Sequence, residues 1–237
     1  MSKKGQVTIF IIIALILVTI VALIFVMNRS VDKDKDVYTD AVRNFIDNCI
    51  EETAKEAVSE IGQNGGYYFP PLASTHAGIP YYYQNGKNIM PSIGIVENQI
   101  SLYMKENLFF CTKNFVQFTN YNISQGTITV DTEIQENRVI LDVNYPITLS
   151  QGEDSATIED FETEVDVRLG LIYNSIAEVV NSSEYGICLT CLYDVADEND
   201  FYVEMLDYDE DSVVILFIDK NSKINEEDFE YVYAVEA

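Results

Sequence analysis

Apolar and polar residues divide the chain into three zones with different patterns. The first zone, from Val7 to Met27, contains no charged residue, and a polar neck with alternating charges follows at residues 28–36. About 20 apolar residues are enough for a helix to cross the hydrocarbon core of a bilayer. The pattern therefore predicts a transmembrane helix over residues 7–27, preceded by a short basic leader at residues 1–6.

Helical periodicity marks the second zone. Apolar residues recur at steps of three and four from about Val37 to Ile61 and again from about Ser92 to Phe115, which predicts two amphipathic helices. Residues 62–92, between these helices, are rich in proline and glycine and have almost no periodicity. Loops of this length are uncommon in compact domains and tend to be functional, so we expect a functional loop here.

The loop at residues 62–92 also contains two aromatic clusters. Tyrosine combines a large contact area with a polar tip, so the clusters are candidates for a surface that binds a protein or glycan partner. The alternative is that the rings fill the base of the domain against the helices. The tyrosines concerned are Tyr67, Tyr68, Tyr81, Tyr82 and Tyr83.

In the third zone, beyond residue 115, apolar and polar residues mostly alternate, which predicts antiparallel strands. Pro146 lies inside one of these runs and predicts an edge position or a bulge. The fold class is therefore α+β, with helices packed on an antiparallel β-sheet in an ectodomain at 37–185. Residues 186–237 form a β-rich subdomain or continue the same domain. The predicted elements are strands at Thr127–Ile134, Arg138–Leu149 and Thr157–Arg168, a helix at Leu169–Val180, and strands near Phe201–Leu206, Val213–Asp219 and Phe229–Val235.

Acidic residues outnumber basic ones by 39 to 14, for a net charge of −25. This charge argues against nucleic acid as a partner, because binding to phosphates relies on clustered Lys and Arg. It suits divalent cations, and alternating carboxylates at Asp207, Asp209 and Asp211 are candidates for loosely bound Ca²⁺. The alternative is that the acidic residues serve only solubility and tolerance of salt. No other cofactor is expected.

The basic leader also predicts the orientation in the membrane. A short leader stays in the cytoplasm more readily than a long domain does, and long domains cross membranes largely regardless of charge. We therefore expect a single-pass protein of the cell membrane, with a cytoplasmic N-terminus and an extracellular C-terminal domain.

The cysteines fall into two pairs. Cys49 and Cys111 lie on the apolar faces of the two predicted helices, so they can meet in a disulfide, which persists outside the cytoplasm. Closing this loop of about 60 residues contributes roughly 4 kcal/mol in the chain-entropy model. Cys188 and Cys191 form a C-x-x-C motif, which serves as a redox pair, half of a zinc site or a short-range disulfide. A short-range disulfide is preferred, because no helix start after the first cysteine is evident.

Signatures of catalysis are sparse. His76 is the single histidine and lies in the proline-rich loop, and neither a nucleophile elbow nor a phosphate-binding glycine loop is present. We expect a protein that is not an enzyme, with a surface-anchored hydrolase as a distant alternative. Asn28, Asn122 and Asn181 each begin an N-x-S sequon that is compatible with glycosylation.

The leader resembles a known processing signal. Lys4, Gly5 and Gln6, followed at once by the apolar helix, resemble the class III, prepilin-type signal of archaeal surface proteins. This resemblance implies cleavage between Gly5 and Gln6 and retention of the helix as an anchor or in a filament core. Many pilins carry a glutamate where this chain has Phe10, although archaeal pilins often do without it. If the neck is helical too, one long helix leads from membrane to domain, as in pilins.

The whole chain also resembles a broad group of uncharacterised archaeal single-pass membrane proteins. The resemblance rests on the Lys-Lys-Gly-Gln-Val-Thr-Ile-Phe start and on the segments 61–67, 79–82 and 144–147. It implies location and architecture and no biochemical activity. The expected role is a membrane-anchored extracellular structural, adhesive or binding module of the cell surface. The alternative is a type IV pilin-like filament subunit or minor pilin, which would self-assemble.

Overall fold

The structure is a computed structural model that describes residues 4–182 and 188–236 of the 237-residue chain. Within this range, the side chains of residues 4–14 and 24–38 lie outside the described set. The chain divides into two compact units, residues 1–45 and 46–237, and each is described by itself.

The described part of the first unit, residues 4–45, is helical. Helix α1 spans Lys4–Gln63 without interruption, so the predicted neck at residues 28–36 is helical. Among the residues whose side chains are described, no helix is both long enough and apolar enough to cross a membrane. Most of the predicted span at residues 7–27 falls outside that set, because only the side chains of residues 15–23 are described there.

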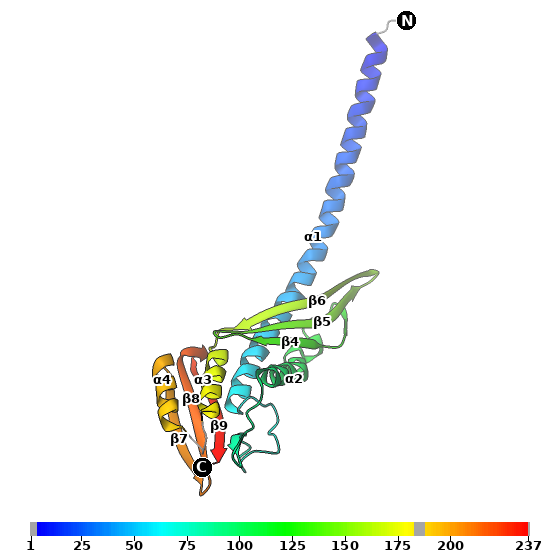
Figure 1. Cartoon of the computed structure of the whole chain (residues 1–237). Coiled ribbons are helices and arrows are strands. Elements are labelled where there is room, and N and C mark those ends of the chain that lie inside the picture. Colours follow the sequence, from blue (N-terminus) through cyan, green and yellow to red (C-terminus); the bar gives the residue numbers. More distant parts are fainter. Residues whose placement is uncertain (1–3, 183–187, 237) are drawn as a thin grey trace. The chain divides into compact units, whose positions relative to one another are not determined.

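The second unit contains the end of α1 and all remaining elements (Figure 1). Its other helices are α2 Ile93–Thr112, the short 3-10 helix η1 Lys113–Phe115, α3 Leu169–Asn181 and α4 Leu189–Asn199. Its strands are β1 Tyr81–Gln84, β2 Lys87–Asn88, β3 Asn122–Gln125, β4 Thr129–Ile134, β5 Val139–Gln151, β6 Asp154–Val165, β7 Tyr202–Asp209, β8 Ser212–Ile224 and β9 Glu227–Glu236.

The strands form two sheets. The larger has the order β2-β1-β9-β8-β7 and is antiparallel except for the parallel pair β1 and β9. In the smaller sheet, β6 pairs along one edge of β5, while β3 and β4 share the other edge. The fold is therefore α+β, as predicted, with one antiparallel and one mixed sheet. Because β1 pairs with β9, the C-terminal strands share a sheet with the proline-rich segment.

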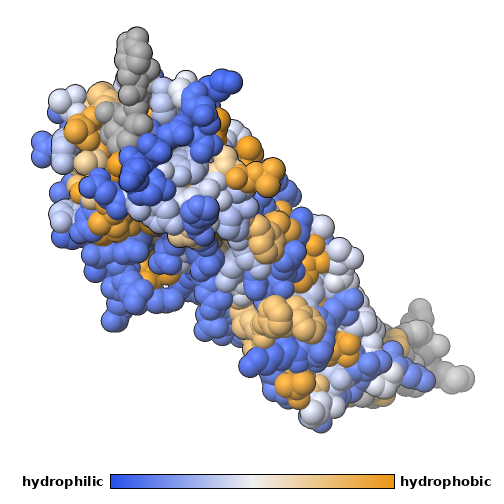
Figure 2. Space-filling model, turned by 90° about the horizontal axis from the view of Figure 1, so that it is seen from below, coloured by the Kyte–Doolittle hydropathy of each residue, from blue (hydrophilic) through white to orange (hydrophobic). Residues whose placement is uncertain are grey.

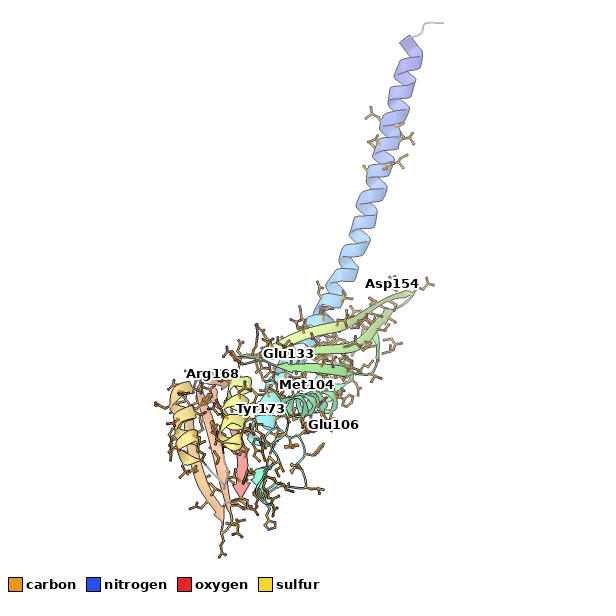
Figure 3. The ribbon with its side chains drawn as sticks, viewed as in Figure 1. Met104, Glu106, Glu133, Asp154, Arg168 and Tyr173 are labelled. Atoms are coloured by element: carbon orange, nitrogen blue, oxygen red, sulfur yellow. A yellow bond between two sulfur atoms is a disulfide. The ribbon has the colours of Figure 1, made fainter. Side chains whose placement is uncertain are left out.

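Polar contacts join the helices to these sheets. Ser101 on α2 hydrogen-bonds Thr132 on β4 through their hydroxyls at 2.8 Å, and the backbone N–H of Ile134 donates to Glu97 Oε1 at 3.0 Å. Tyr173 on α3 donates its hydroxyl proton to the Pro91 carbonyl at 3.0 Å, just before α2 begins (Figure 3). These bonds fix α2 over the smaller sheet and tie α3 to the start of α2.

The predicted strands of the third zone are confirmed to within a few residues. The interruption at Pro146 is a bulge, because the register between β5 and β6 shifts between Asn144 and Ile147. Strand β5 has neighbours on both edges, so the proline does not mark an edge strand. The sequence missed β1 and β2 within the predicted loop, and it also missed β3 and α4.

The end of α1 packs closely on β9 because it lacks side chains there. A Cβ atom on Gly62 would lie 2.6 Å from the Glu230 carbonyl oxygen and 2.8 Å from the Phe229 ring. Gly66 lies three residues beyond the helix and has a φ of +81°, and a Cβ atom there would lie 2.8 Å from the Tyr231 hydroxyl oxygen. Glycine is therefore required at Gly62 for space and at Gly66 for both space and backbone conformation.

Replacing Gly62 with alanine is expected to lower the free energy of unfolding by about 1 to 3 kcal/mol, because the added methyl group overpacks the contact with β9. Urea unfolding of the full chain in detergent measures the change. The control is Gly94→Ala on α2, where the nearest atom to the new Cβ is Glu97 Oε2 at 3.9 Å. Alanine favours a helix by up to about 1 kcal/mol, so this control should be neutral or stabilising. Equal effects at the two glycines would contradict the packing argument.

Candidate functional site

The tyrosine segment is largely part of the core. Tyr82 and Tyr83 are buried, so their prediction as partner-binding residues is wrong. The hydroxyl of Tyr82 donates to the Gly65 carbonyl at 3.1 Å and lies 2.6 Å from the Tyr231 hydroxyl, and its ring stacks on Tyr233 at 4.7 Å. The alternative, that these rings fill the base of the domain, is correct for both, because β1 inserts beside β9.

The other tyrosines of this segment are half-buried. The Tyr68 hydroxyl accepts from the Asn107 side chain at 3.1 Å, and the Tyr81 hydroxyl hydrogen-bonds Ser212 Oγ at 2.8 Å. The most exposed large apolar side chains of the segment are instead those of Phe69 and Leu72. Any partner that contacts this segment therefore meets those two residues more fully than the tyrosines.

The buried tyrosines differ in how their hydroxyls are satisfied. Burial raises the pKa of Tyr82, Tyr231 and Tyr233 well above the ordinary value, so all three stay neutral. Tyr82 and Tyr231 bond each other, whereas the Tyr233 hydroxyl is buried without a hydrogen-bond partner among the described residues. A buried polar group without a partner costs about 1 to 3 kcal/mol.

Replacing Tyr233 with phenylalanine is therefore expected to raise the free energy of unfolding by about 1 kcal/mol, since it removes the unpaired hydroxyl and keeps the ring. Tyr231→Phe is the matched control, and it should lower the free energy of unfolding by about 1 kcal/mol, because it removes the buried hydrogen bond between the Tyr231 and Tyr82 hydroxyls. Denaturant unfolding of both variants tests the difference. A loss of stability in Tyr233→Phe would mean that the hydroxyl has a partner.

The most strongly connected polar cluster joins Arg168 and Asp219 (Figure 3 labels Arg168). Arg168 Nε donates to Asp219 Oδ2 at 2.9 Å, and Nη2 donates to Oδ1. The remaining nitrogen, Nη1, donates to the Asn199 carbonyl at 3.1 Å, and the guanidinium lies 4.9 Å from the centre of the Phe201 ring. The cluster thereby joins the start of α3, strand β8 and the end of α4.

Asp219 is completely buried, yet it stays ionised. Burial by itself raises the pKa of this carboxyl, but hydrogen bonds from Arg168, the Ser222 hydroxyl and the Asn221 backbone N–H, with the charge of Arg168, lower the pKa below its ordinary value. In turn, the hydrogen bond to Asp219 and the charge of its carboxylate raise the pKa of Arg168. The Asp219 carboxylate accepts from all three of these residues and the last Arg168 nitrogen donates to Asn199, which leaves the cluster little capacity to bind a ligand. The cluster is therefore structural.

Sequence reasoning missed this pair, although a signal for half of it exists. Ile215, Phe217 and Asp219 alternate along β8 on the buried face, so the pattern places a carboxylate among apolar residues. A buried carboxylate requires a partner. The sequence does not identify Arg168 as that partner, because the two residues lie on different elements.

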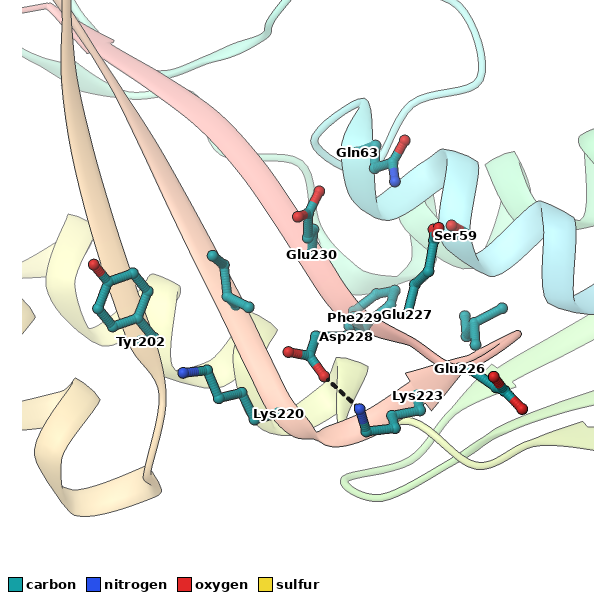
Figure 4. Close-up of a pocket in the computed structure, with 12 residues that line it drawn as sticks. Ser59, Gln63, Tyr202, Lys220, Lys223, Glu226, Glu227, Asp228, Phe229 and Glu230 are labelled. Carbon is teal, nitrogen blue, oxygen red and sulfur yellow. Dashed lines mark hydrogen bonds and ion pairs between the residues drawn. The ribbon is translucent and has the colours of Figure 1, made fainter.

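A pocket with a volume of about 640 Å³ lies beside the end of α1 and the strands β8 and β9 (Figure 4). The end of α1 contributes Ser59, and the strands β7 to β9 contribute lysines and carboxylates. Lys223 Nζ pairs with Asp228 Oδ1 at 2.9 Å, and Lys220 Nζ lies 5.3 Å from the centre of the Tyr202 ring. Its described lining contains neither histidine nor cysteine. The arrangement suits hydrogen bonding to a polar group and offers no nucleophile paired with a base.

The predicted calcium ligands do not converge. Asp207 and Asp209 lie at the end of β7, and Asp211 lies in the turn before β8. The Asp209 carboxylate accepts a hydrogen bond from the Asp211 backbone N–H at 3.1 Å. Within the described ranges, no group of three His, Cys, Asp or Glu side chains is placed to hold a metal ion. The structure therefore gives no support to the calcium prediction.

Both predicted disulfides are present. Cys49 on α1 is bonded to Cys111 on α2, with 5.6 Å between their Cα atoms, and Cys188 is bonded to Cys191. One expectation about the second pair is wrong: Cys188 is the N-cap residue of α4, so a helix does start directly after the first cysteine. The acidic composition of α4 hid this helix from the periodicity argument.

The other predicted sites are placed only in part. Lys4, Gly5 and Gln6 begin α1, but their side chains lie outside the described residues, as does that of Asn28. The remaining candidates are exposed: Asn122 on β3, Asn181 at the end of α3, where its Oδ1 accepts from Asn88 Nδ2 at 2.8 Å, and His76.

Comparisons of the chain with protein-family models, with curated proteins and with solved structures found no match. The functional argument therefore rests on the residues themselves.

Proposed function

We propose that this protein is a single-pass, N-terminally anchored protein of the cell surface, in which residues 46–237 form an extracellular structural, adhesive or binding module without catalytic activity. One observation supports the anchor most directly. Between Leu15 and Leu23, the large apolar side chains of α1 are each 48% to 66% exposed. A continuous exposed apolar surface indicates contact with a membrane or a protein. The described part of this run contains no charged residue.

The second unit has the properties of a domain outside the cytoplasm. It contains two disulfides. Disulfides persist in oxidising compartments and are rare in the cytosol. The face in Figure 2 is mostly hydrophilic, with apolar residues in scattered patches. A net charge of −25 repels nucleic acid and anionic lipid, so the partner is a protein or a glycan.

A filament subunit is the second candidate. Its support is the continuity of α1, because one helix from Lys4 to Gln63 extends from the apolar run into a domain with antiparallel strands. A pilin-like protein uses such a helix both as a membrane anchor and as a filament core. Processing between Gly5 and Gln6 would release the helix for assembly.

Membrane fractionation of the full chain tests the anchor. We expect the protein to sediment with membranes and to require detergent for release, while Ile16→Arg combined with Ile20→Arg shifts it to the soluble fraction. Each arginine in the centre of a membrane helix costs about 3 kcal/mol. The control is Phe110→Arg, which changes an apolar side chain of the second unit that is 66% exposed. A wild-type protein that stays in the supernatant would contradict the anchor.

Intact mass and N-terminal sequencing of the membrane-extracted protein distinguish the two candidates. A chain that begins at Met1 or Ser2 supports the plain anchor. A chain that begins at Gln6 and sediments as filaments after detergent removal supports the pilin-like subunit.

A further inference from the structure

The two disulfides occupy different surroundings. Cys49 on α1 is 2% exposed, and Cys111 is half-buried in the last turn of α2, so this bridge joins two packed helices. Cys188 and Cys191 are only half-buried, and the two residues between them are exposed. Both cysteines of the second bridge are thus partly exposed, whereas one cysteine of the first is buried, so an external thiol can approach the second bridge more easily.

The second bridge also lies where a thiolate would be stabilised. Cys188 is the N-cap of α4, a helix of 11 residues without acidic residues in its first turn. Its Sγ accepts from the Cys191 backbone N–H at 3.3 Å and lies 3.6 Å from Thr190 Oγ1. The backbone N–H groups and the dipole at the start of a helix favour negative charge at this position, which is how C-x-x-C motifs lower the pKa of a thiol.

We propose that Cys188 and Cys191 form a redox-active disulfide that exchanges electrons with external dithiols, whereas the disulfide between Cys49 and Cys111 is a permanent structural bond. The proposal rests on the pair of sulfurs, their exposure and the helix start that follows them. It does not depend on the choice between a plain anchor and a filament subunit.

The exchange follows from the surroundings of the two sulfurs. A thiolate of the external dithiol attacks Cys191 Sγ, forming a mixed disulfide and breaking the bond to Cys188, which leaves as a thiolate. Cys188 is the better leaving group because its Sγ already accepts the Cys191 N–H. The second thiolate of the reductant then attacks its own sulfur in the mixed disulfide and releases Cys191. Two electrons pass from the dithiol, which becomes a cyclic disulfide, and two protons pass to the cysteines.

Reduction at this site leaves the fold in place. The bridge spans a separation of three residues, against 62 for the other bridge, so it constrains the unfolded chain much less. Helix α4 also contacts α3 and β7, and its buried residues Leu192, Val195 and Ala196 lie outside the motif, so we expect it to stay packed.

Selective reduction tests the proposal. The full chain in detergent is treated with dithiothreitol under native conditions, quenched at intervals with iodoacetamide and analysed by peptide mass spectrometry. We expect Cys188 and Cys191 to be labelled at least about tenfold faster than Cys49 and Cys111, which serve as the control within the same molecule. Equal rates, or labelling of the second pair only after unfolding, would overturn the proposal.

Single variants test the role of the helix start. In Cys191→Ser, the rate of Cys188 alkylation is measured as a function of pH. The apparent pKa from this curve should lie at least about one unit below the ordinary thiol pKa of about 8.5. In Cys188→Ser, the apparent pKa of Cys191 should stay near the ordinary value. Two ordinary values would show that the disulfide is merely exposed, and the assignment of Cys188 as the stabilised thiolate would then be wrong.

Discussion

Replacing Asp219 with asparagine is expected to lower the free energy of unfolding at neutral pH by about 3 kcal/mol, the lower end of the range for breaking a buried ion pair. The carboxylate is fully buried, while 20% of the Arg168 side chain is exposed, so water can partly solvate the arginine that is left behind. Asparagine also turns its amide nitrogen or a weaker acceptor toward the donors of Arg168, Ser222 and Asn221.

A surface pair provides the control for this prediction. Asp228 pairs with Lys223 at 2.9 Å, but 57% of the lysine side chain and 32% of the aspartate side chain are exposed. Exposed pairs contribute about 0 to 1 kcal/mol, so Asp228→Asn should change stability little. Urea unfolding of both variants measures the contrast. Replacing Arg168 and Asp219 together by leucine should cost less than the sum of the single changes, because no charge is left unpaired.

The same carboxylate predicts a dependence on pH. Because the pKa of Asp219 is lowered in the folded protein, the unfolded chain binds the proton first as the pH falls below about 4. The stability that Asp219 contributes is therefore complete above that pH and is lost as the pH falls through the folded pKa. Asp219→Asn lacks this group, so its loss of stability relative to the wild type should shrink below pH 4. A constant difference across the acid range would contradict this account.

Removing the disulfide between Cys49 and Cys111 by the double substitution to serine is expected to cost about 4 kcal/mol. The bridge closes a loop with a sequence separation of 62, and the chain-entropy model assigns roughly this value to such a loop. It also joins α1 to α2, so its loss allows the two helices to separate in partly unfolded states.

The second bridge serves as the matched control. Its separation of three residues corresponds to about 1.6 kcal/mol in the same model. Denaturant unfolding of Cys49→Ser/Cys111→Ser and Cys188→Ser/Cys191→Ser under non-reducing conditions should therefore give clearly different losses. Similar losses would show that loop length is not the main origin of the stabilisation.

Local periodicity was enough to predict most of the strands. Along β5, buried apolar side chains occupy every second position because one face of the sheet is buried, and this period is visible without knowing the neighbouring strands. The helical periodicity of the sequence likewise predicted that Cys49 and Cys111 lie on the apolar faces of their helices. Their pairing could be predicted because the number of cysteines leaves few choices.

Local patterns failed where the partner lies far away in the chain. Strand β1 has only four residues, and its position is fixed by parallel pairing with β9 near the C-terminus. The sequence therefore left open whether Tyr82 lies on a binding surface or fills the base of the domain, and the structure shows it buried against Tyr231 and Tyr233. Helix α4 was missed because its buried residues, Leu192, Val195 and Ala196, stand among acidic ones.

The chain alone shows an uncharged apolar run, an acidic composition, the periods of its helices and strands, and a C-x-x-C motif, because each is a property of neighbouring residues. The tertiary structure decided which candidates are surface and which are core. It buried Tyr82 and Tyr83, paired Asp219 with Arg168 and placed Cys188 at the start of a helix. The physical reason is that burial and charge pairing depend on contacts between segments that are distant in sequence. A local pattern contains no information about those contacts.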